Sequence, residues 1–466
     1  MKTKIAVALS LMFLIAIWHC PNANGQVGVS SASVGFAKTG SGSYNHHGQY
    51  MMPQPDFFRI EEFINYHRHD LPLPEGDKRV RLDVQSMKLN SEKSVLQFGI
   101  TTPRALESDQ IPPLNVVLII DESGSMGGEK IENLKKSLRA FVERFRKSDR
   151  IAIVGFESSA RVILPATEKT KVHKILTAID SIRAGGGTNL HAGLMTGYGE
   201  ALKNFDPERT NRVIFLTDGN ANVGKVESSQ IAAESKACIK KGISLVTIGL
   251  GVDFNNGLLR EIADSGRGMM HFVGDAKDIE KTFVKEVDSL LAPAANNVRL
   301  VIELEQDKDL KVYGYDNHLK KGDGKWVLKL DDLNHGATQV VMARIPTKSL
   351  VKGGVVRLEY VDAIHREKVS LNVDCTKIQS ADDPTDSIKR NYSIALLAKG
   401  LYSAAKVSHE GDSKKASRKL ASAIKKAQQV WSLKDKPVKR IVKIVNEYEE
   451  KLDRSRSKFA GSKYDK

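Results

Sequence analysis

The stretch Val116-Val117-Leu118-Ile119-Ile120-Asp121-Glu122-Ser123-Gly124-Ser125-Met126 decides the fold. Its first half is a short apolar run rich in β-branched residues, which is typical of a strand buried on both faces of a sheet. The run ends abruptly in a carboxylate, two hydroxyls and a glycine. We therefore expect this polar tip at the carboxyl end of the strand, the edge of an open α/β sheet where ligands bind.

The polar tip has the chemistry of a metal site. Asp121, Ser123 and Ser125 alternate along the chain, so a tight loop could direct all three side chains at one point, with Gly124 allowing the backbone to bend. One carboxylate and two neutral hydroxyls form a hard oxygen set with little charge. Such a set suits a Mg²⁺ or Mn²⁺ ion that keeps open or water-filled positions.

Two later stretches fit the same centre. Residues 185–190 form a glycine-rich loop that opens a helix, with Thr188 at its mouth, and residues 212–219 form a second buried-strand pattern that ends in Asp218. The order Asp-x-Ser-x-Ser, then Thr, then Asp resembles the metal-ion-dependent adhesion site of the von Willebrand factor A family. That resemblance implies direct metal ligation by the three hydroxyl side chains, and ligation by the two carboxylates directly or through water. It also implies that an acidic side chain of a partner completes the shell.

Further segments resemble the YfbK-like branch of bacterial von Willebrand A proteins. They include Arg-Ile-Glu-Glu-x-Ile-Asn-Tyr from residue 59, Gly-Thr-Asn-Leu-x-Ala-Gly-Leu from residue 187 and Asp-Gly-x-Ala-Asn-Val-Gly from residue 218. The likeness runs from about residue 57 to about residue 345 and fades afterwards. The apolar residues of the first segment have helical spacing, which is typical of packing.

Strand and helix patterns alternate through the centre of the chain. Repeated β-α units predict an α/β fold with a doubly wound, mostly parallel sheet and helices on both faces, the arrangement of the von Willebrand A type. We place this domain at residues 111–292, with its last strand at residues 269–273 and its last helix at residues 279–291.

Alternating apolar and polar residues flank the central domain on both sides. Residues 56–110 predict a helix and two strands, at 79–85 and 94–101, and residues 293–376 contain six strand-like runs. Because antiparallel strands need a second layer to bury their apolar face, we expect strands from both flanks to pair in one β-sandwich-like domain, with the central domain inserted into it.

The amino-terminal residues indicate export. Lysines at positions 2 and 4, an apolar run to Trp18 and small residues near Gly25 predict a signal peptide at residues 1–25, followed by a flexible leader at residues 26–55. The alternatives are a retained membrane anchor and lipidation at Cys20. The predicted location is periplasmic, cell-surface or extracellular. In the exported chain we expect Cys238 and Cys375 to be separate buried thiols rather than a disulfide.

The positive charge is concentrated at the carboxyl-terminal end. The chain carries a formal charge of +15, and residues 377–466 hold 22 Lys and Arg against 11 Asp and Glu. This segment predicts basic helices that form either a solvated face or a contact with an anionic envelope surface. Nucleic acid is disfavoured as a partner because no aromatic residues interleave with the basic ones.

The residues favour a binding protein over an enzyme. Residues 185–190 lack the Gly-Lys-Ser/Thr of a phosphate loop, and the chain has no dinucleotide fingerprint and no His-Glu-x-x-His segment. Only His191 lies near the metal motif in sequence, and a surface histidine explains it. We therefore predict an exported protein that captures an acidic side chain of a protein partner through Mg²⁺. The alternatives are a structural cell-envelope component that the metal only stabilises, and a metal-dependent hydrolase.

Overall fold

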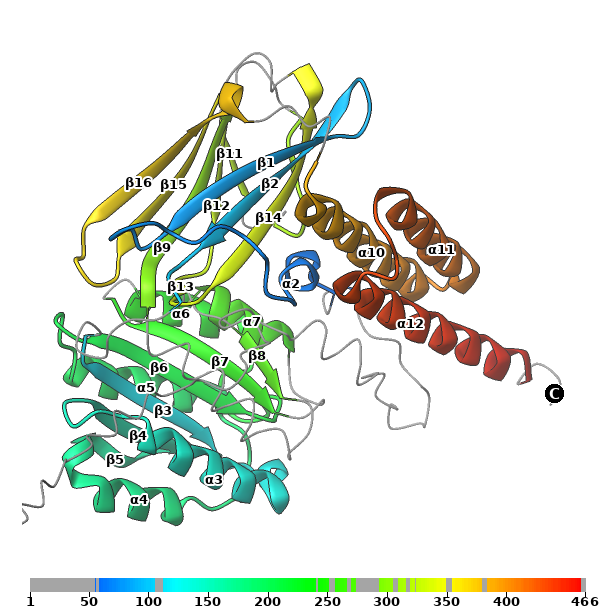
Figure 1. Cartoon of the computed structure of the whole chain (residues 1–466). Coiled ribbons are helices and arrows are strands. Elements are labelled where there is room, and N and C mark those ends of the chain that lie inside the picture. Colours follow the sequence, from blue (N-terminus) through cyan, green and yellow to red (C-terminus); the bar gives the residue numbers. More distant parts are fainter. Residues whose placement is uncertain are drawn as a thin grey trace, which may run out of the picture.

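The structure, a computed structural model, describes residues 55, 58–104, 112–239, 242–250, 256–265, 270–273, 293–304, 309–315, 319–322, 324–348, 354–378 and 384–461. Figure 1 shows an α/β domain below, two antiparallel sheets above it, and three long helices beside them. The predicted signal peptide, the leader to residue 54 and the helix at residues 279–291 lie outside the described residues. The domain limits given above stay predictions.

The α/β domain is built on a mostly parallel sheet. Within the described residues its strand order is β5-β4-β3-β6-β7-β8, and only β5 is antiparallel to its neighbour. The strands are β3 (Leu114–Asp121), β4 (Arg150–Phe156), β5 (Ala160–Glu168), β6 (Thr210–Thr217), β7 (Ser244–Leu250) and β8 (Met270–Val273). The predicted sheet is confirmed, and β3 is buried along its whole length.

Helices cover both faces of this sheet, as predicted. They are α3 (Glu129–Glu143), α4 (Val172–Ser181), α5 (Leu190–Lys203), α6 (Ser228–Ile239) and α7 (Asn256–Ser265). Leu118 of β3 joins the core under α3 and α4, while its neighbour Ile119 joins the core under α5 and α7. Helix α5 lies close to the sheet because it carries Gly197, where a Cβ atom would overlap with the side chain of Ile119.

Strands from both flanks of the α/β domain pair with each other, which confirms the expected insertion. One sheet has the order β1-β2-β14-β10, and the other has the order β11-β12-β9-β15-β16, with β13 paired to β9. The strands are β1 (Arg81–Lys88), β2 (Lys93–Thr101), β9 (Pro293–Leu304), β10 (Lys311–Val312), β11 (Leu319–Gly322), β12 (Lys325–Lys329), β13 (Leu333–Asn334), β14 (Thr338–Pro346), β15 (Gly354–Asp362) and β16 (Lys368–Asp374). Phe98 of β2 and Leu300 of β9 belong to one buried core between the sheets. The sequence pattern missed the short strands β11 and β13.

The carboxyl-terminal segment is helical and packs on the outer face of the sandwich sheet β1-β2-β14-β10. It comprises α10 (Asp386–His409), α11 (Ser413–Val430) and α12 (Lys436–Gly461). Ile388 and Tyr392 of α10 share a core with Met342 of β14 and Phe63 of α2 (Ile60–Ile64). Among the described residues, no helix is long and apolar enough to cross a membrane. Cys375 is a buried free thiol, as expected, and the side chain of Cys238 lies outside the described residues.

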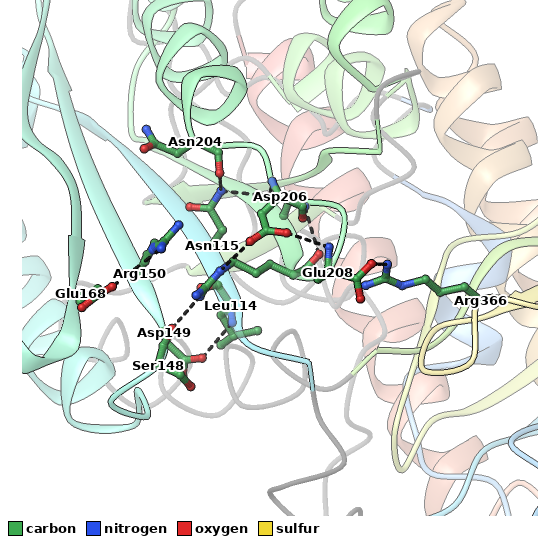
Figure 2. A network of polar contacts seen from close by, with 12 residues as sticks. Leu114, Asn115, Ser148, Asp149, Arg150, Glu168, Asn204, Asp206, Glu208 and Arg366 are labelled. Carbon is green, nitrogen blue, oxygen red and sulfur yellow. Dashed lines mark hydrogen bonds and ion pairs between the residues drawn. The ribbon is translucent and has the colours of Figure 1, made fainter.

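A polar junction joins the α/β domain to the sandwich. Figure 2 shows a network at the amino ends of β3 and β6, in which Arg366, from the turn after β15, pairs with Glu208 at 2.6 Å. In the same network Asn115 of β3 donates a hydrogen bond to the Asn204 carbonyl oxygen at 2.7 Å. The junction therefore lies at the end of the sheet opposite to Asp121.

A pair of histidines follows α2, with His69 buried and His67 partly buried. The rings of His67 and His69 meet edge to face, with centroids 4.4 Å apart, and His69 Nε2 lies 3.1 Å from Asn65 Oδ1. Burial is the largest cause that lowers the pKa of His67 to about 4. The positive charges of Arg390 and Arg440 lower it further, while Asp435 raises it.

This depressed pKa predicts a pH-dependent stability. His67 has an ordinary pKa of 6.5, so the unfolded chain binds a proton below that pH, whereas the folded protein binds it only near pH 4. Its contribution is therefore present above pH 6.5 and is lost as the pH falls, by about 2 kcal/mol at pH 5. Urea denaturation of His67→Gln at pH 7 and pH 5 should show a smaller loss than in the wild type. The exposed His173→Gln is the control, and an equal loss in all three proteins would contradict the assignment.

Candidate functional site

The site begins where two neighbouring parallel strands end. Ile120 of β3 lies opposite Leu216 of β6, so Asp121 is level with Thr217, and Asp218 follows one residue later. The side chains of Asp121 and Asp218 are buried, although both belong to a charged residue type. Because charges are seldom buried without compensation, each carboxylate must be satisfied locally.

Hydrogen bonds from β6 and from the loop after β3 fix the carboxylate of Asp121. The backbone N–H of Ser123 donates to Asp121 Oδ1 at 2.8 Å, and the hydroxyl of Thr217 donates to Oδ2. The pKa of Asp121 is nevertheless raised, first by burial and also by the negative charge of Asp218, although these hydrogen bonds lower it. The two carboxylates are therefore close enough to repel each other, and a cation between them would relieve that repulsion.

The hydroxyls of the loop connect the two strand ends. Ser123 Oγ lies 3.0 Å from Ser125 Oγ, and the Ser125 hydroxyl donates to Asp218 Oδ1 at 2.7 Å. The short helix η2 (Gly124–Met126) turns the chain here. Ser123 is buried whereas Ser125 is exposed, so the cluster opens to solvent on the Ser125 side.

Thr188 reaches the same centre from the glycine-rich loop. A Cβ atom on Gly219 would lie 3.4 Å from Thr188 Oγ1 and 3.7 Å from Asp121 Oδ2, so both oxygens border Gly219 at this edge of the sheet. The loop is held to the loop after β3 because Gly186, which has a φ of +78°, accepts a hydrogen bond from the Gly124 N–H at 3.2 Å. A residue with a side chain would be strained at that φ.

The five sequence-predicted residues are thus brought together in one cluster. Two carboxylates and three hydroxyls converge there: Asp121, Asp218, Ser123, Ser125 and Thr188. This donor set fits Mg²⁺ or Mn²⁺, which prefer oxygen ligands and tolerate waters in the remaining positions. Within the part of the chain that the structure describes, no three His, Cys, Asp or Glu side chains gather into a metal site of another type.

Sequence reasoning missed the cation of this cluster. The ammonium of Lys130, at the start of α3, forms an ion pair with Asp218 Oδ2 and donates to the Ser125 carbonyl oxygen at 3.2 Å. Its side chain is about one-third exposed, whereas that of Asp218 is fully buried. With Lys130 positive and Asp121 and Asp218 negative, the cluster has a net charge of −1 and retains attraction for a divalent cation.

A second buried carboxylate, that of Glu122, fixes the loop after β3. Glu122 pairs with Arg161 of β5 at 2.7 Å and accepts a hydrogen bond from the Arg183 backbone N–H at 3.2 Å. The Glu122 carbonyl oxygen accepts the Gly185 N–H at 2.7 Å, which ties the two loops together. His191, expected to be a surface histidine, is partly buried, and its Nε2 lies 2.7 Å from Glu234 Oε2.

Comparison with known proteins identifies the central domain. Residues 115–285 match the family model of the von Willebrand factor type A domain. The chain is 30% identical over 266 residues to uncharacterized protein YfbK of Escherichia coli, which covers 55% of this chain and 46% of that protein. It is 24% identical over 347 residues to uncharacterized protein sll0103 of Synechocystis, covering 69% and 80%. It is also 29% identical over 233 residues to inter-alpha-trypsin inhibitor heavy chain H2 of Sus scrofa, covering 48% and 25%. The chain therefore spans about half the length of YfbK.

Two solved structures share the fold over most of the chain. The ArnB paralog VWA2 from Sulfolobus acidocaldarius is 19% identical with a TM-score of 0.51, and 80% of this chain covers 98% of it. A von Willebrand factor type A protein from Catenulispora acidiphila is 16% identical with a TM-score of 0.53, covering 80% and 95%. At these identities the likeness establishes the fold alone.

The buried Glu122 carboxylate yields a stability prediction. Arg161→Met leaves this carboxylate buried without its cation, and we expect a loss of about 2 kcal/mol in the free energy of unfolding, less than for a fully buried pair because Arg161 is half exposed. Adding Glu122→Gln to Arg161→Met should restore most of that loss, because the amide carries no charge. Urea denaturation of the two single variants and the double variant measures the coupling. If the losses in the free energy of unfolding of the two single variants simply added up in the double variant, the role assigned to this pair would be contradicted.

Proposed function

We propose that the protein, whose residues 115–285 form a von Willebrand factor type A domain, is a non-enzymatic binding protein that captures an acidic side chain of a protein partner through one divalent cation. The cation is Mg²⁺ or Mn²⁺, held by the cluster of five residues at the end of β3 and β6. The observation that carries this proposal is the convergence of two buried carboxylates with three hydroxyls at a sheet edge that is open to solvent.

The charge of the cluster supports capture of an anion. Asp121, Asp218 and Lys130 together carry −1, and a divalent cation changes this to +1. One carboxylate from a partner would then restore neutrality. Neutral hydroxyl ligands leave such a cation short of negative charge, so it holds an added carboxylate strongly.

The polar groups around the cluster support binding rather than turnover. A hydrolase needs a positioned general base, and the described side chains that contact the two carboxylates are a lysine and hydroxyls. The position of the cluster also suits a partner, because the sandwich meets the α/β domain at the opposite end of the sheet. An exported location remains part of the proposal.

Metal titration of the purified protein tests the site. Calorimetry with Mg²⁺ and Mn²⁺ should show one ion per wild-type chain and no binding to Asp121→Ala or Thr188→Ala. The exposed Asp70→Ala and Thr170→Ala are matched controls that should bind as the wild type does. A Mn²⁺ isotherm that is unchanged in Asp121→Ala would refute the site.

Capture of a partner is tested separately from metal binding. Proteins retained by the immobilised chain in Mg²⁺ should be released by EDTA and should not be retained by Asp121→Ala, while circular dichroism stays unchanged. If EDTA lowers only the unfolding temperature and leaves binding intact, the cation merely stabilises the fold. A ligand present at one hundred times its Kd raises the free energy of unfolding by about 2.7 kcal/mol.

We expect the positive charge of the native Lys130 to weaken metal binding and to strengthen anion binding by the metal-loaded site. Lys130→Met removes one positive charge next to Asp218, so the cluster reaches −2 and we expect the Mn²⁺ affinity to rise about tenfold. The metal-loaded variant should in turn bind an Asp-containing peptide more weakly, because its net charge is zero. Lys136→Met, on the exposed side of the same helix, is the control. Equal Mn²⁺ affinities for the two variants would contradict the role of Lys130.

A further inference from the structure

Two like charges lie side by side on the first sheet of the sandwich. In the antiparallel pair of β10 and β14, Lys311 lies directly opposite Arg344. Directly opposite residues share a face of the sheet, and like charges in such a pair destabilise it. Arg344 follows the buried Met342 by two residues, so both side chains lie on the face that packs against α10.

The carboxyl-terminal helices add two more cations to the same place. Lys399 of α10 lies with its Nζ 6.0 Å from the centroid of the Tyr313 ring, two residues beyond Lys311. Burial lowers the pKa of Lys399, and the charges of Lys311, Arg344 and Lys426 of α11 lower it further. We call Lys311, Arg344, Lys399 and Lys426 the cation cluster. In the described part of the chain, no carboxylate lies within ion-pair distance of any of its four members.

A solvent-open cavity of about 690 Å³ adjoins the cation cluster. Lys426 lines both. The other described lining residues include the apolar Met87, Tyr392, Leu396 and Val430 together with polar and basic residues, and none of them is acidic. The cavity and the cluster lie along one row across neighbouring strands, in which Met87 faces Val95, Val95 faces Arg344 and Arg344 faces Lys311. Strands are about 4.8 Å apart, so Met87 is separated from Arg344 by about 10 Å and from Lys311, at the other end of the row, by about 14 Å.

We propose that this face binds a small anionic amphiphile, with a phosphate monoester group on the cation cluster and an apolar body in the cavity. A cavity of this size suits a small molecule. Four cations that have no carboxylate within ion-pair distance among the described residues favour a dianion over a single carboxylate, and an arginine can hold phosphate with two parallel hydrogen bonds. The site needs no metal and is independent of the function proposed for the α/β domain.

The site differs from a solvated basic helix. The exposed face of α11 also carries many lysines and arginines, and no acidic residue occurs in that helix. However, two of the four clustered cations come from the sandwich strands and lie directly opposite each other. Dispersed charges would make the protein equally soluble without this repulsion. The arrangement therefore indicates a ligand that contacts both the sandwich strands and the carboxyl-terminal helices.

Calorimetry with short-chain lipids tests the proposal on the purified protein in EDTA. Dihexanoyl phosphatidic acid should bind one to one and at least tenfold more tightly than inorganic phosphate, because only the lipid also fills the cavity. Dihexanoyl phosphatidylcholine, which has the same chains and no net charge, should not bind. Equal affinities for the two lipids, or for the lipid and free phosphate, would overturn the proposal.

Variants locate the binding. Arg344→Gln and Lys399→Met should each weaken binding of the phosphatidic acid at least tenfold, and Leu396→Asn should weaken it without changing the affinity for phosphate. The exposed Lys415→Met on α11 is the charge-matched control. The unfolding temperature of ligand-free Arg344→Gln should stay equal or rise, because like-charge repulsion is relieved. Binding that is lost in Lys415→Met and kept in Lys399→Met would place it on the exposed helix face and refute the cavity site.

Discussion

The need to neutralise two buried carboxylates governs the α/β domain. Asp121 and Asp218 end neighbouring strands, where the parallel sheet forces their side chains to the same edge. Hydrogen bonds from Ser123 and Thr217 satisfy the carboxylate of Asp121. The ammonium of Lys130 compensates the charge of Asp218. Glu122 in turn ties the loop after β3 to the glycine-rich loop, so the edge forms one connected polar unit on an otherwise apolar sheet.

The parts of the site that sequence could predict are those set by local spacing. Asp121, Ser123 and Ser125 follow a buried apolar run within five residues, so their convergence needs only a strand that ends and a loop that turns. Thr188 and Asp218 follow from the same logic, because a glycine-rich loop and a second buried strand reach the same edge. The arrangement of the sheet, its two helical layers and the pairing of the flanking strands were predictable for the same reason: apolar periodicity fixes which face each element buries.

Lys130 was not predictable in this way. Its ammonium reaches Asp218 only because α3 begins at Glu129 and its first turn lies over the loop after β3. The cation cluster was still less accessible, since the register that opposes Lys311 and Arg344 depends on pairing between distant strands. From composition alone, the lysines of α10 and α11 indicate only a basic surface, and the half-buried position of Lys399 emerges from packing against Tyr313.

The pairing of β2 with β14 also makes the two domains cooperative. Every residue of the α/β domain lies in the chain between these strands, so an unfolded α/β domain would be a long flexible loop that the sandwich must close. Loop closure costs conformational entropy, by about 0.6 kcal/mol for each doubling of length. Once the α/β domain folds, its two ends are held by compact structure and most of that loop is already ordered. Any ligand that stabilises the inserted domain therefore also favours assembly of the sandwich, without touching a single sandwich residue.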